Sequence, residues 1–145
     1  MLYTLIEGIL LIFIYRHEES QIKWKKVISI ILALYILIFV LTLFGNFSHE
    51  INSTIEAVIL LFLSLKAYLS FLNNTLDSLI TDHYFFWFNS AVFLYFGTSF
   101  FLVMFENSIR FSDPRISYLT WSIHLVSNII FNTLLGIGIW KAKTK

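Results

Sequence analysis

Long apolar runs that alternate with short polar segments constrain this chain more than any other feature of its sequence. Segments 27–45, 54–72, 84–105 and 117–140 each hold about 20 mostly apolar residues. An α-helix needs about that length to cross a hydrocarbon core of roughly 30 Å. The sequence therefore predicts several membrane-spanning helices.

The first apolar run, residues 2–15, is shorter and would form about 21 Å of helix. It lacks the positively charged start and the small-residue cleavage site of a signal peptide. We interpret it as a short first span, or as the remnant of a longer helix. The sequence thus predicts an all-α fold, a polytopic membrane bundle of about five transmembrane helices. We expect one integral-membrane domain over residues 1–145, with no extramembrane domain.

The composition of the chain supports the same class. Of its 145 residues, 58% are hydrophobic and only 13% are charged, whereas a soluble domain carries about 25% charged residues. The formal net charge is +1, which provides no basic surface for a nucleic acid. These values exclude a soluble globular enzyme, a disordered chain and a nucleic-acid binder. Heavy use of Asn, Ile, Lys and Phe indicates a bacterial chain.

The basic residues predict how the chain is oriented, because cytoplasmic loops are enriched in Lys and Arg. With five spans, seven basic residues fall on one side of the membrane: Arg16, Lys23, Lys25, Lys26, Lys141, Lys143 and Lys145. The opposite loops contain only Arg110 and Arg115. We expect a multi-pass protein of the inner (plasma) membrane with its N-terminus outside and its C-terminus in the cytoplasm.

Polar residues in the last span form the strongest candidate site. His124, Asn128 and Asn132 are spaced i, i+4, i+8 and cover a helical arc of about 80°, with Trp121 on the same face. We expect this stripe to face other helices. It could line a ligand or proton site, because polar groups within spans are costly and commonly functional. Alternatively, the same groups could bond across helices and hold the bundle together.

Three ionisable residues are predicted to share the outer leaflet. Counted at 1.5 Å per residue, Glu7, Glu56 and His124 each lie within about 10 Å of that surface. We predict that Glu7 interacts with His124. By the same count, Asn89 in the fourth span could reach Asn132. No metal site is expected, because only one histidine lies at this depth and catalytic zinc usually takes three protein ligands.

Motifs that would indicate catalysis are missing from the sequence. His17-Glu18 and His49-Glu50 are not followed by the second histidine of the zinc-protease pattern H-E-x-x-H. The sequence also lacks G-x-S-x-G, the phosphate-binding G-x-x-x-x-G-K-[ST] and paired intramembrane aspartates. We therefore expect neither an enzyme nor a bound cofactor.

The last two predicted helices resemble a known family. The stretch from Phe86 to Phe96, followed by Trp121-Ser122-Ile123-His124 and then by Asn128 to Asn132, is similar to an uncharacterised bacterial multi-spanning family. Its helices occur in small membrane proteins or as the membrane-embedded sensor portion of two-component histidine kinases. The resemblance covers about the C-terminal 60 residues. It implies a sensory or regulatory role, with Asn89, His124, Asn128 and Asn132 as the matching positions.

The sequence as a whole favours a non-enzymatic sensory or regulatory protein. We expect a ligand or membrane state to change how the polar stripe packs, and a partner protein to respond at the cytoplasmic face. The alternative is a small oligomeric channel or carrier lined by the same stripe. A third possibility is a scaffold, in which the stripe contributes only to stability. The expected partners are the lipid bilayer and either a second protein or further copies of the chain.

Overall fold

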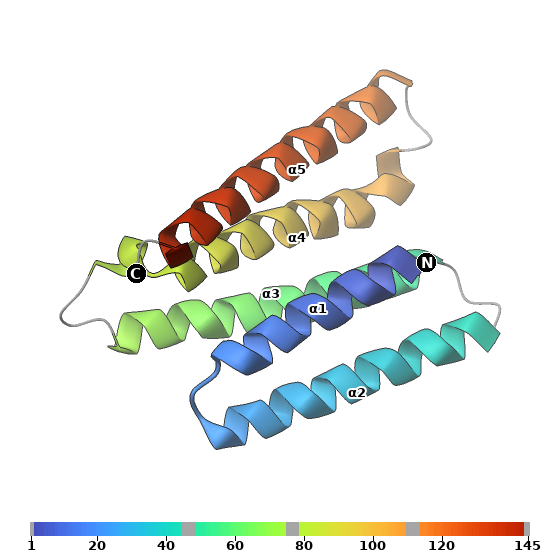
Figure 1. The fold of residues 1–145 in the computed structure, drawn as a ribbon. Helices are drawn as coiled ribbons and strands as arrows, with labels where there is room; N and C mark the ends of the chain where they lie inside the picture. Colours follow the sequence, from blue (N-terminus) through green and yellow to red (C-terminus); the bar gives the residue numbers. More distant parts are fainter. Residues whose placement is uncertain (1, 45–48, 75–78, 110–113, 144–145) are drawn as a thin grey trace. The chain divides into compact units, whose positions relative to one another are not determined.

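The computed structural model describes residues 2–44, 49–74, 79–109 and 114–143 (Figure 1). These residues form the helices α1 (Leu2–Glu18), α2 (Ile22–Phe44), α3 (His49–Asn74), α4 (Tyr84–Ile109) and α5 (Pro114–Lys143), with a 3-10 turn, η1 (Ile80–Asp82), before α4. No strand occurs in the described part of the chain. The prediction of an all-helical fold with five helices is confirmed.

Four helices in the described ranges are long and apolar enough to cross a membrane. Their candidate spans are Ile22–Thr42, Ile51–Asn73, Tyr84–Val103 and Tyr118–Lys143. The chain is therefore a multi-pass membrane protein. Helix α1 is shorter, with 17 residues, and its interpretation as a further span stays a prediction.

Several helices are longer than the apolar runs indicated. Helix α3 begins at His49 rather than at residue 54, and α4 continues to Ile109. Helix α5 begins at Pro114, so the loop expected over residues 106–116 is wrong at both of its ends. Proline favours the first position of a helix because its fixed φ suits the helix and its missing N–H would have no helical partner there. The predicted end of the second apolar run, at residue 45, lies outside the described residues.

The chain divides into two compact units, Met1–Leu63 and Ser64–Lys145, which we call the N-terminal and C-terminal units and describe separately. The boundary falls within α3. The expectation of a single domain stays a prediction.

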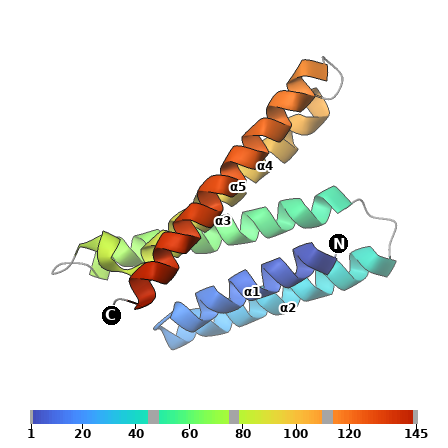
Figure 2. The same ribbon diagram turned by 45° about the horizontal axis from the view of Figure 1, so that its top comes forward.

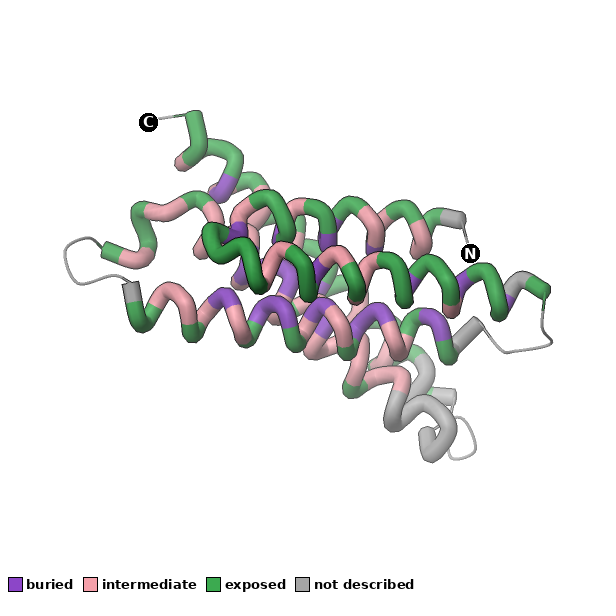
Figure 3. Tube along the Cα trace, turned by 90° about the horizontal axis from the view of Figure 1, so that it is seen from below, coloured by how far each residue is buried: buried purple, intermediate pink, exposed green. Residues whose placement is uncertain are grey.

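In the N-terminal unit, α1 and α2 lie side by side and antiparallel (Figures 1 and 2). Residues 19–21 form the short turn between them, in which Oε1 of Glu19 accepts a 3.0 Å hydrogen bond from the backbone N–H of Gln21. The core of this unit is formed by Leu11, Ile12, Tyr15, Ile28, Tyr35, Phe39, Ala57, Leu60 and Leu63. Buried residues recur every three or four positions along α3 (Figure 3), which is the spacing of one helix face.

In the C-terminal unit, α4 and α5 run antiparallel along one another (Figure 1). The ring of Tyr95 on α4 packs 4.9 Å from that of Phe131 on α5. Further along, a Cβ atom at Gly138 would lie 3.2 Å from the backbone oxygen of Tyr84. Glycine at this position therefore allows the end of α5 to pack closely on the first turn of α4.

Candidate functional site

A cluster of buried polar groups lies in the N-terminal unit. The Tyr35 hydroxyl on α2 donates a 3.2 Å hydrogen bond to the backbone oxygen of Thr4 on α1. Tyr35 is 2% exposed, and Glu56 on α3 is 3% exposed. A Cβ atom at Gly8 would lie 2.6 Å from Oη of Tyr35 and 2.8 Å from Oε1 of Glu56. We call Thr4, Gly8, Tyr35 and Glu56 the Glu56 cluster.

The Glu56 cluster exists because Gly8 has no side chain. Any larger residue would occupy the space that the Tyr35 hydroxyl and the Glu56 carboxyl group use. Glu7, the neighbour of Gly8 on α1, is close enough to interact electrostatically with both Tyr35 and Glu56. Three helices thus bring two carboxyl groups and a phenol together.

Glu56 also has an unsatisfied oxygen. Its Oε1 atom is buried and has no hydrogen-bond partner in the described part of the chain. A buried polar atom of this kind costs free energy, and the cost is larger when the group is charged. The cluster therefore offers an oxygen-lined position that suits a hydrogen-bond donor or a cation.

A second buried polar contact connects α2 and α3 near the cluster. Nδ2 of Asn52 donates a 2.7 Å hydrogen bond to Oγ1 of Thr42, which itself donates to the backbone oxygen of Phe39 at 2.7 Å. Asn52 precedes Glu56 by about one helical turn, and Thr42 is two residues from the last residue of α2. This pair therefore lies between the Glu56 cluster and the end of the unit where α2 ends and α3 begins.

Asn89 is buried in the C-terminal unit, in a different environment from the one expected. It is 0% exposed, and its Nδ2 donates a 3.2 Å hydrogen bond to the backbone oxygen of Ser64 on α3. One position further on, the hydroxyl groups of Ser90 and Tyr68 lie 2.8 Å apart. The predicted pairing of Asn89 with Asn132 is wrong, because Asn132 bonds within its own helix.

The polar stripe of α5 faces α4 at only one of its positions. The His124 ring is half-buried and lies 5.7 Å from that of Tyr95. Asn128 and Asn132 are exposed, and Nδ2 of Asn132 donates a 2.8 Å hydrogen bond to the backbone oxygen of Asn128. Trp121, on the same face, is 64% exposed. Most of the stripe therefore points away from the helix on which α5 packs.

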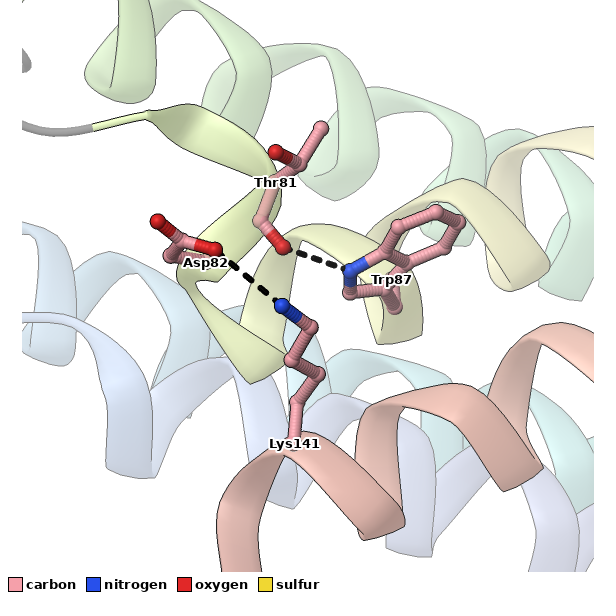
Figure 4. Close-up of polar contacts among 4 residues, drawn as sticks. All are labelled: Thr81, Asp82, Trp87 and Lys141. Atoms are coloured by element: carbon pink, nitrogen blue, oxygen red, sulfur yellow. Dashed lines mark hydrogen bonds and ion pairs between the residues drawn. The ribbon is translucent and has the colours of Figure 1, made fainter. Parts of the chain in front are cut away.

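Polar contacts connect the end of α5 to the segment before α4 (Figure 4). Nζ of Lys141 lies 3.1 Å from Oδ1 of Asp82, and Nε1 of Trp87 donates a 2.8 Å hydrogen bond to the backbone oxygen of Thr81. The Lys141 and Asp82 side chains are partly exposed, so the ion pair adds little stability. It places the C-terminal end of α5 beside η1.

The expectations based on depth have mixed outcomes. Glu7 and Glu56 do share one site, but the predicted interaction of Glu7 with His124 joins the two units and stays a prediction. Sequence reasoning missed Tyr35, Gly8 and Thr42. Tyr35 could have been found from its depth in the membrane. It lies nine residues before the end of α2, and Glu56 lies seven residues after the start of α3, so the two are at similar distances from the same membrane surface.

Neither a group of metal-binding residues nor a similarity to a known protein indicates a role for this chain. Among the described residues, no three His, Cys, Asp or Glu side chains are grouped so that they could hold a metal ion. No protein-family model, curated protein or solved structure matches the chain.

Proposed function

We propose that the chain is a non-enzymatic sensory or regulatory membrane protein that acts through a partner, and that α5 binds a transmembrane helix of that partner. The supporting observation is the exposure of Asn128 and Asn132 in the middle of a helix that is apolar enough to cross a membrane. Carboxamide groups exposed to lipid are costly, whereas they bond readily to polar groups of a neighbouring transmembrane helix. The two side chains are thus suited to a helix from outside the chain.

The remaining faces of α5 agree with this role. Helix α5 has the smallest buried share of the four candidate spans, and α4 occupies the side that contains Phe131 and Gly138. A partner that changes its contact with Asn128 and Asn132 would shift the packing of α5 on α4. We propose that this shift carries the signal, because a ligand or partner acts by favouring one packing over another.

The proposed orientation puts the C-terminus in the cytoplasm of a cell with an inner (plasma) membrane. Arg16 in the last turn of α1 and Lys23, Lys25 and Lys26 at the start of α2 support it. Lys141 and Lys143 end α5, and the contact of Lys141 with Asp82 adds η1 to the same side.

The orientation can be tested with single cysteines, because the chain has none of its own. We expect Ser20→Cys and Ala142→Cys, both at exposed positions, to react with a membrane-impermeant maleimide in inverted membrane vesicles. Neither should react in intact cells. Labelling in intact cells would show that the orientation is the opposite of the proposed one.

Site-specific photo-crosslinking tests the proposed interface. A photoreactive amino acid at Ile129, which lies between the two asparagines and is 66% exposed, should crosslink to a second membrane protein in native membranes. The substitutions Asn128→Leu and Asn132→Leu should reduce that product several-fold. The same photoreactive residue at Leu34, exposed on α2, is the control and should not give this product.

The same experiment separates the proposal from its alternative. The outward-facing stripe would also line a pore if several copies of the chain assembled around it. Crosslinks only between copies, together with ion flux through vesicles that contain the pure chain, would support a channel or carrier and contradict the proposal. Crosslinks to lipid alone would contradict both.

A further inference from the structure

The N-terminal unit buries a carboxyl oxygen that lacks a hydrogen-bond partner among the described residues, Oε1 of Glu56. The polar atom that shares its side of Gly8 is also an oxygen, Oη of Tyr35, whose hydrogen is directed to the Thr4 backbone oxygen. Buried polar atoms in proteins are almost always satisfied by a partner. A partner for Oε1 of Glu56 must therefore supply a hydrogen or a positive charge.

The hydroxyl group of Tyr35 is oriented so that its oxygen can accept a hydrogen bond. Its own hydrogen is directed to the backbone oxygen of Thr4, which leaves lone pairs on Oη free. Oη of Tyr35 and Oε1 of Glu56 both lie within 3 Å of the position that a Cβ atom of Gly8 would take. The two oxygens therefore flank the same point, and Oη is the acceptor that a hydrogen on the Glu56 carboxyl group would meet once either side chain moves toward the other.

The surroundings of Glu56 favour the uptake of a positive charge. The titratable groups that interact with it are Glu7 from α1 and Tyr35 from α2, and neither brings a positive charge. Two nearby carboxylates repel one another when both are ionised, and a low dielectric strengthens that repulsion. One added proton removes the repulsion and the buried negative charge.

A buried polar pair lies on the side of Glu56 that faces one end of the unit. The hydrogen-bonded pair of Thr42 and Asn52 lies between Glu56 and the end where α2 stops and α3 begins. Both side chains are buried, so they provide a hydroxyl and a carboxamide where apolar residues would otherwise separate Glu56 from water.

We propose that Glu56 is a proton-exchange site within the membrane, which takes a proton from water at the end where α2 stops and α3 begins and returns it there. The proton adds to an oxygen of the Glu56 carboxylate, and on release it passes to water and leaves the carboxylate behind. No other bond changes. The site is independent of the partner interface proposed on α5.

Infrared spectroscopy of the full chain near neutral pH, in vesicles of an ether-linked phosphatidylcholine that has no ester carbonyl, tests this proposal. We expect the C=O stretching band of a protonated carboxylic acid, and we expect it to move to lower frequency in D₂O as the proton exchanges. Glu56→Gln should remove the band. Glu18→Gln, the same change at the last residue of α1, is the matched control and should retain it.

The exchange rate tests the route. Thr42→Val removes the hydroxyl group but nearly preserves the shape of the side chain, so the band should remain while its shift in D₂O slows several-fold. Thr133→Val, the same change on α5, should leave the rate unchanged. A Thr42→Val rate equal to that of the unsubstituted chain would overturn the assigned route.

Three results would overturn the site itself: no protonated carboxyl band in the unsubstituted chain, a band that Glu56→Gln leaves in place, or a band that does not shift in D₂O. If Glu56→Gln does not fold, the unsubstituted chain can be labelled with ¹³C at its glutamate carboxyl groups. The band should then move to lower frequency, and a band that does not move would overturn the proposal.

Discussion

The carboxamide of Asn52 donates a 2.7 Å hydrogen bond to the hydroxyl oxygen of Thr42, and both side chains are buried. Thr42→Val removes the acceptor and leaves a buried N–H group without this partner. Because an unsatisfied buried donor costs its full desolvation energy, we expect the free energy of unfolding to fall by about 1–3 kcal/mol. Reversible unfolding in mixed micelles measures this change.

The double variant Thr42→Val with Asn52→Leu provides the control. It removes both partners, so no buried donor is left unsatisfied, and its cost should be smaller than the sum of the two single costs. Strictly additive costs would show that the hydrogen bond does not couple α2 to α3.

The close approach of Tyr35 and Glu56 to Gly8 predicts a steric effect. In Gly8→Ala, the new Cβ atom would meet Oη of Tyr35 at 2.6 Å and Oε1 of Glu56 at 2.8 Å, so one or both side chains must move. Overpacking of this kind typically costs about 1–3 kcal/mol of stability. Thermal unfolding in detergent should show a lower midpoint than that of the unsubstituted chain.

Tyr35→Phe identifies the atom responsible for that effect. Tyr35→Phe removes Oη, the atom nearest to the new methyl group, but keeps the ring carbon Cζ and leaves Oε1 of Glu56, each 2.8 Å away. Gly8→Ala should therefore cost less in the Tyr35→Phe background than alone, and part of the cost should remain. An equal cost in both backgrounds would mean that the Tyr35 hydroxyl is not what Gly8 accommodates.

The spans could be predicted from the sequence, whereas the faces that they bury could not. A run of about 20 apolar residues is a property of one segment and is visible without any partner. In a membrane, however, the outside of the bundle is as apolar as the inside, so periodicity does not reveal which face packs. For this reason the outward direction of Asn128 and the complete burial of Asn89 required the structure.

The Glu56 cluster was predictable only in part. The depth of Glu7 and Glu56 followed from counting residues, because both lie close to the predicted ends of their helices. The role of Gly8 did not follow, since nothing in the sequence indicates that two side chains from other helices converge on that position. Helix ends were also hard to place: α5 begins at Pro114 and not at residue 117, because proline and the polar residues that follow it can start a helix ahead of the apolar run.

Asparagines at three positions should respond differently to the same substitution. Asn89→Leu removes a buried carboxamide that donates to the backbone oxygen of Ser64, and we expect a loss of about 1–3 kcal/mol in the free energy of unfolding. Asn128→Leu and Asn132→Leu change exposed side chains, so each should alter that free energy by less than about 0.5 kcal/mol. Unfolding of the isolated chain in detergent measures all three.

The reverse order would contradict the assignment of faces. If Asn128→Leu or Asn132→Leu destabilised the isolated chain more than Asn89→Leu, the stripe would have a packing role within the chain, as in the scaffold alternative. The loss of crosslinking expected for these variants would then result from destabilisation of the chain and not from the loss of an interface.

Two glycines in the last turns of α5 provide a matched pair. A Cβ atom at Gly138 would lie 3.2 Å from the backbone oxygen of Tyr84 and 3.5 Å from Cβ of Trp87, whereas a Cβ atom at Gly136 meets nothing within 4 Å. Because backbone atoms cannot move aside as a flexible side chain does, Gly138→Val should force α5 away from α4 and cost about 1–3 kcal/mol. Gly136→Val should cost less than about 1 kcal/mol. Trp87 lies at this contact, so its fluorescence should report the displacement in Gly138→Val alone; equal spectra and equal stabilities in the two variants would show that α5 does not pack on α4 through Gly138.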